Sequence, residues 1–398
     1  MRIAVFHNLL SGGAKRSLSE IVKYLSKKHQ MCIFEPTFSD RSFCKLSNGY
    51  NVEVKTIYDQ GLCSSFLTYF DVSHGIQWFL GIIILFIYYK RIKNQINYWN
   101  PDIVLVFPCR FLQSPILMRY LYSPIIYFPM EPPRYAYEDF YNECGKEHLT
   151  AARNTVRKIK KYLWRILDKN NVSRATQIIA ISRYAQEYIY HVYQRNVPVC
   201  HFGVNDSEFI RIPAITKENI VLSIGRLQRL KGHDFVLRSM AKVKRTRDHL
   251  LVIICDSVDP SEKIYLENLA NKLGESIIIK EGVSHDELLK WYNRAKVLAC
   301  GQVMEPFGLI VLEAMACGTP VVAVNEGGFK ETIPHNIGGL LVDRDEQKFA
   351  VALEYFLNNT TESVEWGKRA RKTVVRDWTW EATCNKIEKV LESVQRNN

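Results

Sequence analysis

Residues 305–320 have the sequence EPFGLIVLEAMACGTP and follow the apolar run 297–299 after a short loop. Gly308 precedes a run of helix-forming residues, and Gly318 stands where a glycine commonly ends a helix. The next apolar run, 320–324, has the length and composition of a buried strand. The stretch therefore predicts a strand–helix–strand unit whose two strands are parallel.

The start of this helix belongs to the carboxyl edge of the predicted sheet, where the ligands of open α/β sheets bind. Backbone N–H groups at a helix start suit a phosphate. Glu313 lies about two turns into the helix, so on the order of 10 Å separates it from Glu305. A carboxylate accepts two hydroxyl donors, so this spacing suits one glutamate on a ribose and the other on a second polyhydroxyl group. The alternative is that both glutamates are surface residues.

Two cations follow the strand predicted at 220–224, within the sequence GRLQRLKG at 225–232. Arg226 and Lys231 therefore belong to the same sheet edge as the helix start. Two cations beside a helix N-terminus form a diphosphate site that needs no metal. The sequence NEGGFKE at 325–331 follows the next strand and either brings backbone close to a ligand or is an ordinary turn.

Strands and helices alternate in two series, which predicts an α/β protein with two doubly wound parallel sheets. The first series begins with a strand at 3–6, the turn Ser11-Gly12-Gly13 and a helix at 17–28. Its other strands are predicted at 30–34, 52–57, 103–107, 125–128 and 177–181. The second series has strands at 220–224, 250–254, 277–279, 297–299, 320–324 and 340–342. We interpret 211–216 as a linker and 380–394 as a final amphipathic helix.

The charge of the chain is concentrated in its first half. The 398 residues are 47% apolar, which excludes a disordered or collagen-like chain, and the length predicts two or three domains. Residues 1–200 hold 26 Lys and Arg against 14 Asp and Glu, whereas residues 201–398 hold 27 of each. The first half therefore carries the whole net charge of +12, and we expect it to face a membrane surface or nucleic acid.

Residues 78–89, WFLGIIILFIYY, form an apolar segment that is followed by the basic sequence KRIK. The segment is shorter than the roughly 20 residues that cross a bilayer as a helix. It is therefore either a buried core helix or an interfacial anchor with its basic end at the headgroups. A second basic stretch, 153–165, alternates cations with apolar residues. This stretch either contacts a membrane or is a solvated helix face. Because both lie in the basic half and neither carries a nucleic-acid-binding motif, we expect peripheral membrane contact.

Several motifs are absent from the sequence. The ten cysteines form no C-x-x-C pair, and no H-E-x-x-H occurs, so metal-ligand spacing is missing. We expect reduced core cysteines in a cytosolic protein. The apolar run 3–6 has only the length of a strand and does not indicate a signal peptide. No G-x-G-x-x-G follows it, which disfavours a dinucleotide dehydrogenase.

Together these features resemble the retaining glycosyltransferases of family 4, whose GT-B fold consists of two Rossmann-like domains facing a central cleft. The resemblance covers most of the chain and is most specific at 305–320. It rests on these stretches: Ser11-Gly12-Gly13-Ala14, Ile179-Ala180-Ile181-Ser182, Gly203-Val204-Asn205, Gly225-Arg226, Lys231-Gly232, 305–320 and Trp378-Thr379-Trp380-Glu381. It implies an acceptor-binding domain at 1–210, a nucleotide-sugar-binding domain at 211–379, and a helix at 380–398 that crosses back to the first domain.

The resemblance also implies roles for individual residues. Glu313 would bind the donor ribose and Glu305 the donor sugar, and two cations would neutralise the diphosphate as it leaves. These cations are Arg226 and Lys231. The remaining implied donor contacts are backbone groups at Phe307, Gly308 and Leu309, and at Gly12 and Gly13 across the cleft. We expect no metal and no cofactor other than the donor substrate, a nucleotide diphosphate sugar.

Some positions depart from the family pattern. Met130 stands where the family often has a sugar-contacting His. The sequence CDS at 255–257 replaces a glycine-rich turn, and Asn205 replaces a common Asp. These departures concern the sugar and the base of the donor and leave the predicted diphosphate site intact.

Three further residues are candidate acceptor or sugar contacts. Glu131 and Arg134 belong to the run Glu131-Pro132-Pro133-Arg134, which is similar to a subset of the family that includes mannosyltransferases. His7 ends the first strand and either contacts a ligand or has a structural role. The sequence DRD at 343–345 matches the D-x-D of metal-dependent glycosyltransferases, but at this place in the chain we interpret it as a loop turn.

The implied function is a retaining transfer of a hexose from GDP-mannose or a UDP-hexose to a lipid-linked or glycan acceptor. We expect it at the cytoplasmic face of a membrane, without nucleic acid as a partner. Since no carboxylate is evident as a covalent nucleophile, we favour attack on the same face of the sugar, assisted by the leaving phosphate. A catalytically degenerate membrane-associated scaffold and a basic nucleic-acid-binding protein stay open as alternatives.

Overall fold

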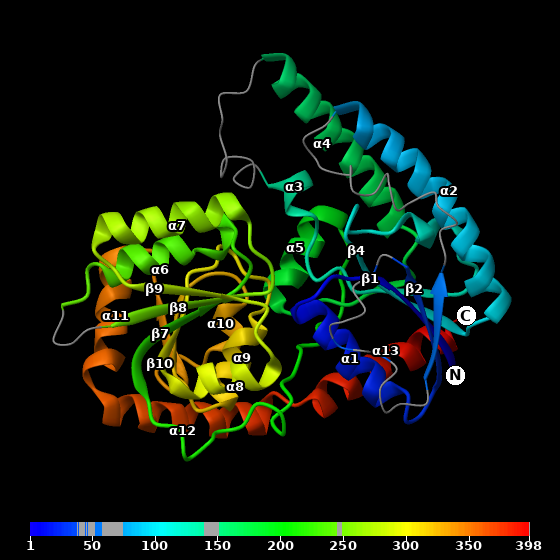
Figure 1. The fold of residues 1–398 in the computed structure, drawn as a ribbon. Coiled ribbons are helices and arrows are strands. Elements are labelled where there is room, and N and C mark those ends of the chain that lie inside the picture. The colour runs from blue at the N-terminus through cyan, green and yellow to red at the C-terminus, as the bar shows by residue number, and fades with distance from the viewer. Residues whose placement is uncertain are drawn as a thin grey trace. The chain divides into compact units, whose positions relative to one another are not determined.

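The computed structural model describes residues 1–37, 39, 44, 46, 52–57, 75–138, 151–244 and 249–397, with only the backbone for 75–77 and 151–153 (Figure 1). The chain divides into two compact units. The first comprises Met1–Ile181, Ala185–Cys200 and Cys384–Asn398, and the second comprises Ser182–Tyr184 and His201–Thr383. Residues 211–216, expected as a linker, lie within the second unit. The chain passes between the units at four places, after residues 181, 184, 200 and 383. The second of these lies in helix α5 (Arg183–Tyr193) and the fourth in helix α13 (Trp380–Arg396).

The first unit contains a parallel six-stranded sheet with the order β3-β2-β1-β4-β5-β6. Its strands are β1 (Arg2–Asn8), β2 (Gln30–Pro36), β3 (Val52–Ile57), β4 (Ile103–Cys109), β5 (Ile125–Tyr127) and β6 (Gln177–Ile178). Besides α5 and the end of α13, its helices are α1 (Gly13–Leu25), α2 (Gly75–Trp99), the short η2 (Ile116–Tyr120), α3 (Arg134–Tyr137) and α4 (Ala151–Val172). The strand order reverses between β1 and β4.

The second unit contains another parallel six-stranded sheet, with the order β12-β11-β10-β7-β8-β9. Its strands are β7 (Glu218–Ile224), β8 (Leu250–Cys255), β9 (Ile277–Glu281), β10 (Ala295–Cys300), β11 (Val321–Val324) and β12 (Gly339–Val342). Its helices are η4 (Arg229–Lys231), α6 (His233–Met240), α7 (Pro260–Leu273), α8 (His285–Arg294), α9 (Leu309–Ala316), α10 (Phe329–Thr332), α11 (Glu346–Asn358) and α12 (Thr360–Asp377). Here the order reverses between β7 and β10.

The predicted α/β class with two doubly wound parallel sheets is confirmed. Central strands such as β4 and β10 are buried along their whole length, which explains their continuous apolar sequences. The prediction at 177–181 was too long, because β6 ends at Ile178 and Ala180 forms only an isolated bridge with Val199. The helix predicted at 17–28 begins earlier, at Gly13, and ends at Leu25.

The described cysteines have the predicted core character. Eight of them are free, and all of these except Cys44 are buried. Cys63 and Cys144 lie outside the described residues.

The apolar segment 78–89 is part of α2, which is 25 residues long and continues through the basic residues that follow the segment. One face of α2 is core, since Trp78, Leu85 and Tyr89 are fully buried. The opposite face is exposed and apolar: Phe79, Leu80, Ile83 and Ile87 are 38%, 45%, 56% and 44% exposed. The described residues include no helix that is long and apolar enough to cross a membrane.

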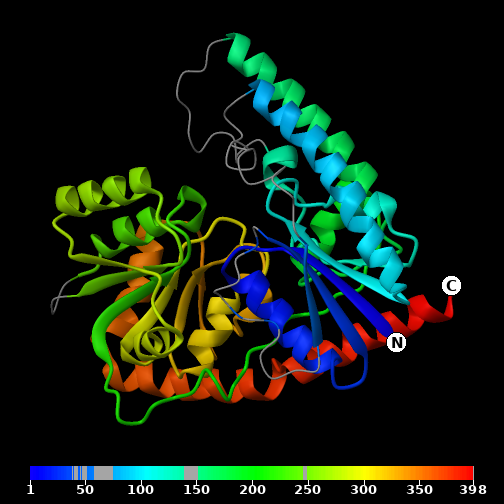
Figure 2. The ribbon, with the colours of Figure 1, turned by 45° about the vertical axis from the view of Figure 1, so that its right-hand side comes forward.

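Helices α2 and α4 lie side by side in the first unit (Figures 1 and 2). Trp78 of α2 stacks on Trp164 of α4 with ring centroids 6.0 Å apart. Like α2, helix α4 has exposed apolar side chains, which are Val156, Ile159, Tyr162 and Ile166. The segment 78–89 is therefore a core helix on one face and an exposed apolar surface on the other.

Candidate functional site

The site predicted from sequence lies where the second sheet reverses its strand order. Strand β7 has β8 on one side and β10 on the other, and Leu222 of β7 pairs with Leu298 of β10. The loops 225–232 and 301–308 therefore leave the same sheet edge as neighbours, and the Val303 N–H donates a 2.9 Å hydrogen bond to the Leu230 carbonyl. In open parallel sheets this reversal point is where ligands bind.

Lys231 and Glu305, predicted from separate motifs, meet at this edge. Nζ of Lys231 lies 2.8 Å from Oε2 of Glu305, and their side chains remain 30% and 22% exposed. Gly232 makes the approach of the two loops possible, because its φ is +64° and a Cβ there would lie 2.0 Å from the carbonyl oxygen of Gly301. A cation and a carboxylate are thus presented together to a polar ligand.

Arg226 lies in the same loop but pairs with a different carboxylate. Its Nε is 3.9 Å from Oδ2 of Asp256, and its side chain is 42% exposed. Gly225, which begins this loop, packs on the side chain of Lys231: a Cβ at Gly225 would lie 3.3 Å from Cδ of Lys231. Asp256 belongs to the sequence that replaces the family's glycine-rich turn. The structure therefore joins Lys231 to Glu305 and places Arg226 in an exposed pair with Asp256.

The turn predicted at 325–331 contacts the loop that carries Glu305. The Gly328 N–H donates a 2.7 Å hydrogen bond to the Glu305 carbonyl. Gly327 has a φ of +54°, and a Cβ there would lie 2.4 Å from the same carbonyl oxygen. The two glycines thus allow backbone to pack directly on the backbone of Glu305.

Glu313 is buried on helix α9. Only 3% of it is exposed, and the hydroxyl of Tyr292 on α8 donates a 2.7 Å hydrogen bond to its Oε2. The alternative that Glu313 is a surface residue is therefore excluded. Gly308 precedes α9 with a φ of +95°, and no side chain caps the first turn of the helix. The start of α9 is thus suited to an anionic ligand.

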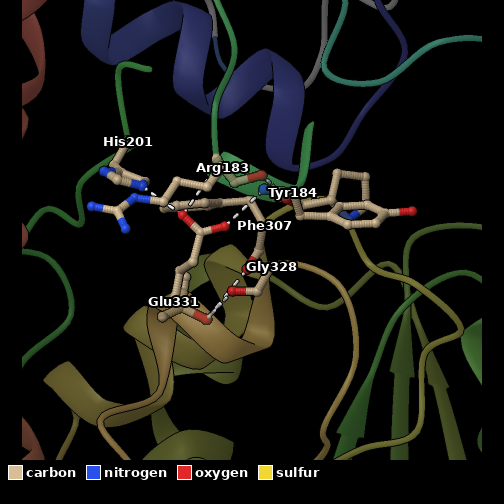
Figure 3. Close-up of polar contacts among 9 residues, drawn as sticks. Arg183, Tyr184, His201, Phe307, Gly328 and Glu331 are labelled. Carbon is tan, nitrogen blue, oxygen red and sulfur yellow. Dashed lines mark hydrogen bonds and ion pairs between the residues drawn. The ribbon is translucent and has the colours of Figure 1, made fainter. Parts of the chain in front are cut away.

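A second carboxylate network, around Glu331 of α10, lies next to the loop that carries Glu305 (Figure 3). Oε2 of Glu331 is 2.8 Å from Nε2 of His201, and its carboxylate accepts the backbone N–H groups of Arg183 and Tyr184 at 2.9 and 3.0 Å. Burial by itself raises the pKa of Glu331, but these hydrogen bonds outweigh it and hold this pKa below its usual value. Glu331 therefore fixes the first turn of α5.

Backbone carbonyls of the Glu305 loop are also fixed by hydroxyl groups. Ser182 Oγ donates to the Pro306 carbonyl at 2.6 Å, and Thr332 Oγ1 donates to the Phe307 carbonyl at 3.3 Å. Phe307 is 2% exposed and packs against His201 and Trp378, with ring centroids 6.2 and 5.8 Å away. Hydrogen bonds to backbone carbonyls and contacts between aromatic rings thus hold the loop.

The sequence DRD at 343–345 forms a structural turn. Asp343 pairs with Lys348 at 2.7 Å, and Asp345 caps α11 by accepting the Lys348 N–H. Arg344 donates to both carboxylate oxygens of Glu326 at 2.7 Å and to the carbonyls of Gly301 and Gln302 at 2.9 Å. Arg344 therefore supports the loop after β10. No group of three His, Cys, Asp or Glu side chains suited to a metal ion occurs within the described part of the chain.

The residues predicted in the first half of the chain lie in the first unit. Gly12 precedes α1 with a φ of +123°, and Gly13 is the first residue of this helix, beyond the end of β1. His7 is completely buried, with its Nε2 3.5 Å from Oε2 of Glu35. Burial lowers the pKa of His7, which favours its neutral form.

Glu131 lies in the short connection between β5 and α3, and Arg134 is the first residue of α3. The Glu131 carbonyl accepts a 2.7 Å hydrogen bond from Gln113 Nε2, and Arg134 Nε lies 2.8 Å from Oε2 of Glu138. Met130 has a φ of +60°, an uncommon value for a residue with a side chain.

A buried carboxylate that no motif had indicated anchors this region of the first unit. Asp168 on α4 accepts hydrogen bonds from Ser114 Oγ at 2.6 Å and from the hydroxyls of Tyr137 and Tyr193 at 2.8 Å. Burial raises the pKa of Asp168 to about 6, although all three hydroxyls favour the charged form. Asp168 therefore connects α4 with α3 and α5.

Tyr292 and Arg344 were also missed as supports of the second-unit site. Tyr292 had no sequence signal, since it lies in an ordinary amphipathic helix 21 residues from the glutamate that it contacts. The sequence identifies Arg344 only as the middle residue of D-x-D. Both act through long-range contacts that a local pattern does not contain.

Solved structures of the same fold define the class of this chain, which is GT-B. The structure of HepE from Anabaena in complex with UDP and glucose has a TM-score of 0.70 and 18% identity, covering 99% of this chain and 100% of that chain. Sucrose-phosphate synthase from Thermosynechococcus elongatus has a TM-score of 0.72 and 19% identity, with 100% of both chains covered. At these identities the likeness shows the fold.

Residues 205–373 match the model of the family described as Glycosyl transferases group 1. An uncharacterized glycosyltransferase of Methanocaldococcus jannaschii is 30% identical over 230 residues, which are 52% of this chain and 57% of that protein. D-inositol 3-phosphate glycosyltransferase of Thermobispora bispora is 28% identical over 250 residues, 57% of this chain and 56% of that protein. The chain thus spans little more than half the length of these curated relatives.

These findings confirm the predicted resemblance to GT-B glycosyltransferases. The family match includes the motifs from Gly225 to Pro320. The candidate residues Gly12, Gly13, His7, Glu131 and Arg134 lie outside it. Membership of family 4 and a mannosyltransferase-like character stay predictions.

Proposed function

We propose that the protein is a family 4-like glycosyltransferase that moves a hexose from a nucleotide diphosphate sugar to an acceptor hydroxyl with retention of the anomeric configuration. The observation that carries this proposal is the Lys231–Glu305 pair beside the uncapped start of α9. A cation and helix-start N–H groups suit a diphosphate, and a carboxylate suits sugar hydroxyls.

The names of similar proteins support a sugar nucleotide as donor. One solved HepE structure holds UDP and glucose, and another holds UDP-glucose. Several relatives of this chain are named D-inositol 3-phosphate glycosyltransferases. We therefore propose a UDP-hexose or GDP-mannose as the donor.

In the proposed reaction the donor diphosphate displaces Glu305 from Lys231. The cation then neutralises the phosphate, and the released carboxylate accepts hydroxyl groups of the sugar. The bond between the anomeric carbon and the phosphate oxygen breaks while the acceptor oxygen forms the new bond on the same face. The acceptor proton passes to the leaving phosphate. Lys231, with Arg226 in the same loop, stabilises the negative charge that develops, without a metal ion.

Nucleotide binding gives the direct test. UDP and GDP, and the corresponding sugar nucleotides, are expected to raise the melting temperature of the protein, because a ligand at 100 times its Kd stabilises the native state by about 2.7 kcal/mol. UMP and GMP serve as controls, since they lack the second phosphate. Transfer from a radiolabelled sugar nucleotide then identifies the hexose. If neither diphosphate raises the melting temperature, the enzyme proposal fails and the scaffold alternative is favoured.

We further propose that the acceptor is a lipid-linked or glycan substrate at the cytoplasmic face of a membrane, approached by the first unit. The support is the exposed apolar face of α2, defined by Phe79, Leu80, Ile83 and Ile87, together with the similar side chains on α4. Exposed cations such as Lys90 and Lys158 lie on the same two helices. Apolar side chains that enter the interface and cations that meet anionic headgroups together suit peripheral binding.

The double variant Leu80→Glu/Ile83→Glu tests membrane contact. Both side chains are exposed, so folding is retained, whereas binding to vesicles that contain anionic lipid is expected to fall at least about tenfold. Sedimentation with vesicles measures the bound fraction. Ile264→Glu on α7 is the matched control, because Ile264 is 59% exposed and lies in the second unit. Unchanged sedimentation of the double variant would remove the membrane proposal.

A further inference from the structure

His233 is completely enclosed beneath the loop that carries Arg226. It is the first residue of α6, is 1% exposed, and is not among the residues that the family resemblance assigned. Its Nε2 lies 3.3 Å from the carbonyl oxygen of Gly225 and 3.2 Å from that of Arg226. Its Nδ1 lies 2.9 Å from Oγ of Ser223, which is also fully buried.

These contacts determine which ring nitrogen carries the proton. Carbonyl oxygens only accept hydrogen bonds, so Nε2 must be protonated and donate to both of them. Nδ1 of the neutral ring is then an acceptor, and the Ser223 hydroxyl donates to it. Burial lowers the pKa of His233 to about 4, which agrees with a neutral ring at physiological pH.

We infer that His233 is a positioning residue for the diphosphate site, an inference that rests on the proposed function. Its Nε2–H holds the carbonyls of Gly225 and Arg226 toward the interior of the second unit. In a trans peptide the N–H points away from the carbonyl, so the same bonds orient the N–H groups of Arg226 and Leu227. The backbone from which the Arg226 side chain departs is thereby set before a ligand binds.

Two substitutions test the Nε2–H donor of His233 separately from its Nδ1 acceptor. In His233→Gln the side-chain amide reaches the position of Nε2 and continues to donate to the carbonyls. In His233→Asn the amide reaches only the position of Nδ1, so the Gly225 carbonyl loses the His233 donor, and the Arg226 carbonyl keeps only the 2.9 Å hydrogen bond from the Gln228 N–H. The loss of a hydrogen-bond donor inside the protein costs about 1–3 kcal/mol, enough to displace the loop at Gly225.

Calorimetric titration with UDP and GDP measures the effect on binding. His233→Asn is expected to weaken binding of the better nucleotide about tenfold and to speed amide hydrogen exchange at Arg226 and Leu227. His233→Gln is expected to stay within about threefold of the wild type. Met240→Ala, at the other end of α6 and 2% exposed, is the control for loss of stability, and its nucleotide affinity is expected to be unchanged.

The outcomes distinguish this inference from the proposed function. If the wild type binds UDP or GDP and both His233 variants bind equally well with unchanged amide exchange, the positioning role is overturned. Equal losses of affinity in Met240→Ala and His233→Asn would also overturn it, because they would trace to stability alone. If the wild type binds neither nucleotide, the proposed function fails and the positioning role for a diphosphate site fails with it.

Discussion

The variant Lys231→Ala is expected to transfer sugar about two to three orders of magnitude more slowly than the wild type. Lys231 is the cation in direct contact with Glu305, at 2.8 Å, in the loop where we place the leaving diphosphate. Its removal takes away charge stabilisation that matters most when the bond to the phosphate breaks. Steady-state kinetics with a radiolabelled sugar nucleotide measure the loss, which should appear mainly in kcat.

Lys242→Ala is the matched control for this variant. Lys242 also pairs with a glutamate at 2.7 Å, but the partner is Glu346 and both side chains are about one third exposed or more. A surface pair of this kind contributes about 0–1 kcal/mol, so activity and stability should hardly change. If Lys231→Ala and Lys242→Ala retained equal turnover, Lys231 would have no role in leaving-group stabilisation.

Gly327→Ala is expected to lower turnover at least about tenfold, because small displacements of a binding group reduce rates steeply. A Cβ at this position would lie 2.4 Å from the carbonyl oxygen of Glu305 and 2.9 Å from its nitrogen. Both are backbone atoms, so the clash is relieved only by moving Glu305 or the turn that contacts it. The residue proposed to hold the donor sugar would thus shift relative to Lys231.

Gly274→Ala isolates the conformational part of this effect. Gly274 has a φ of +68°, close to the +54° of Gly327, but no atom lies within 4 Å of a Cβ there. Both variants therefore pay about 1 kcal/mol for a side chain in the left-handed region, and only Gly327→Ala meets a neighbour. Thermal unfolding and transfer assays of the two variants compare the effects. Equal activity in both would show that the turn does not position Glu305.

Much of the candidate site was predictable because parallel sheets impose a simple geometry. The apolar runs that became β7 and β10 are buried strands, and the residues after them share one sheet edge. Lys231 and Glu305 are 74 residues apart in sequence and in contact in the structure. Their position at one sheet edge was predictable from sequence, whereas their direct contact depends on the adjacency of β10 and β7, which only the structure shows.

The supports of the site were not predictable in this way. Tyr292 on Glu313 and Arg344 on Glu326 are contacts between separate elements, and each depends on how helices and loops pack. The two carbonyls held by His233 have no sequence signal, because every residue has a carbonyl. The buried face of helix α2 was not predictable from sequence either. The apolar sequence of this helix is continuous, and only packing distinguishes buried Leu85 from exposed Ile83.

The sequence alone therefore determined the α/β class, the two parallel sheets and the sheet edge that carries the cations and carboxylates. These features depend on local periodicity and on glycines at turns, which neighbouring residues encode. Tertiary structure alone decided that Glu305 pairs with Lys231 rather than Arg226, that Glu313 is buried, and which face of α2 is exposed. The physical reason is that such contacts join residues far apart in the chain, and their geometry exists only once the packed sheet and helices bring them together.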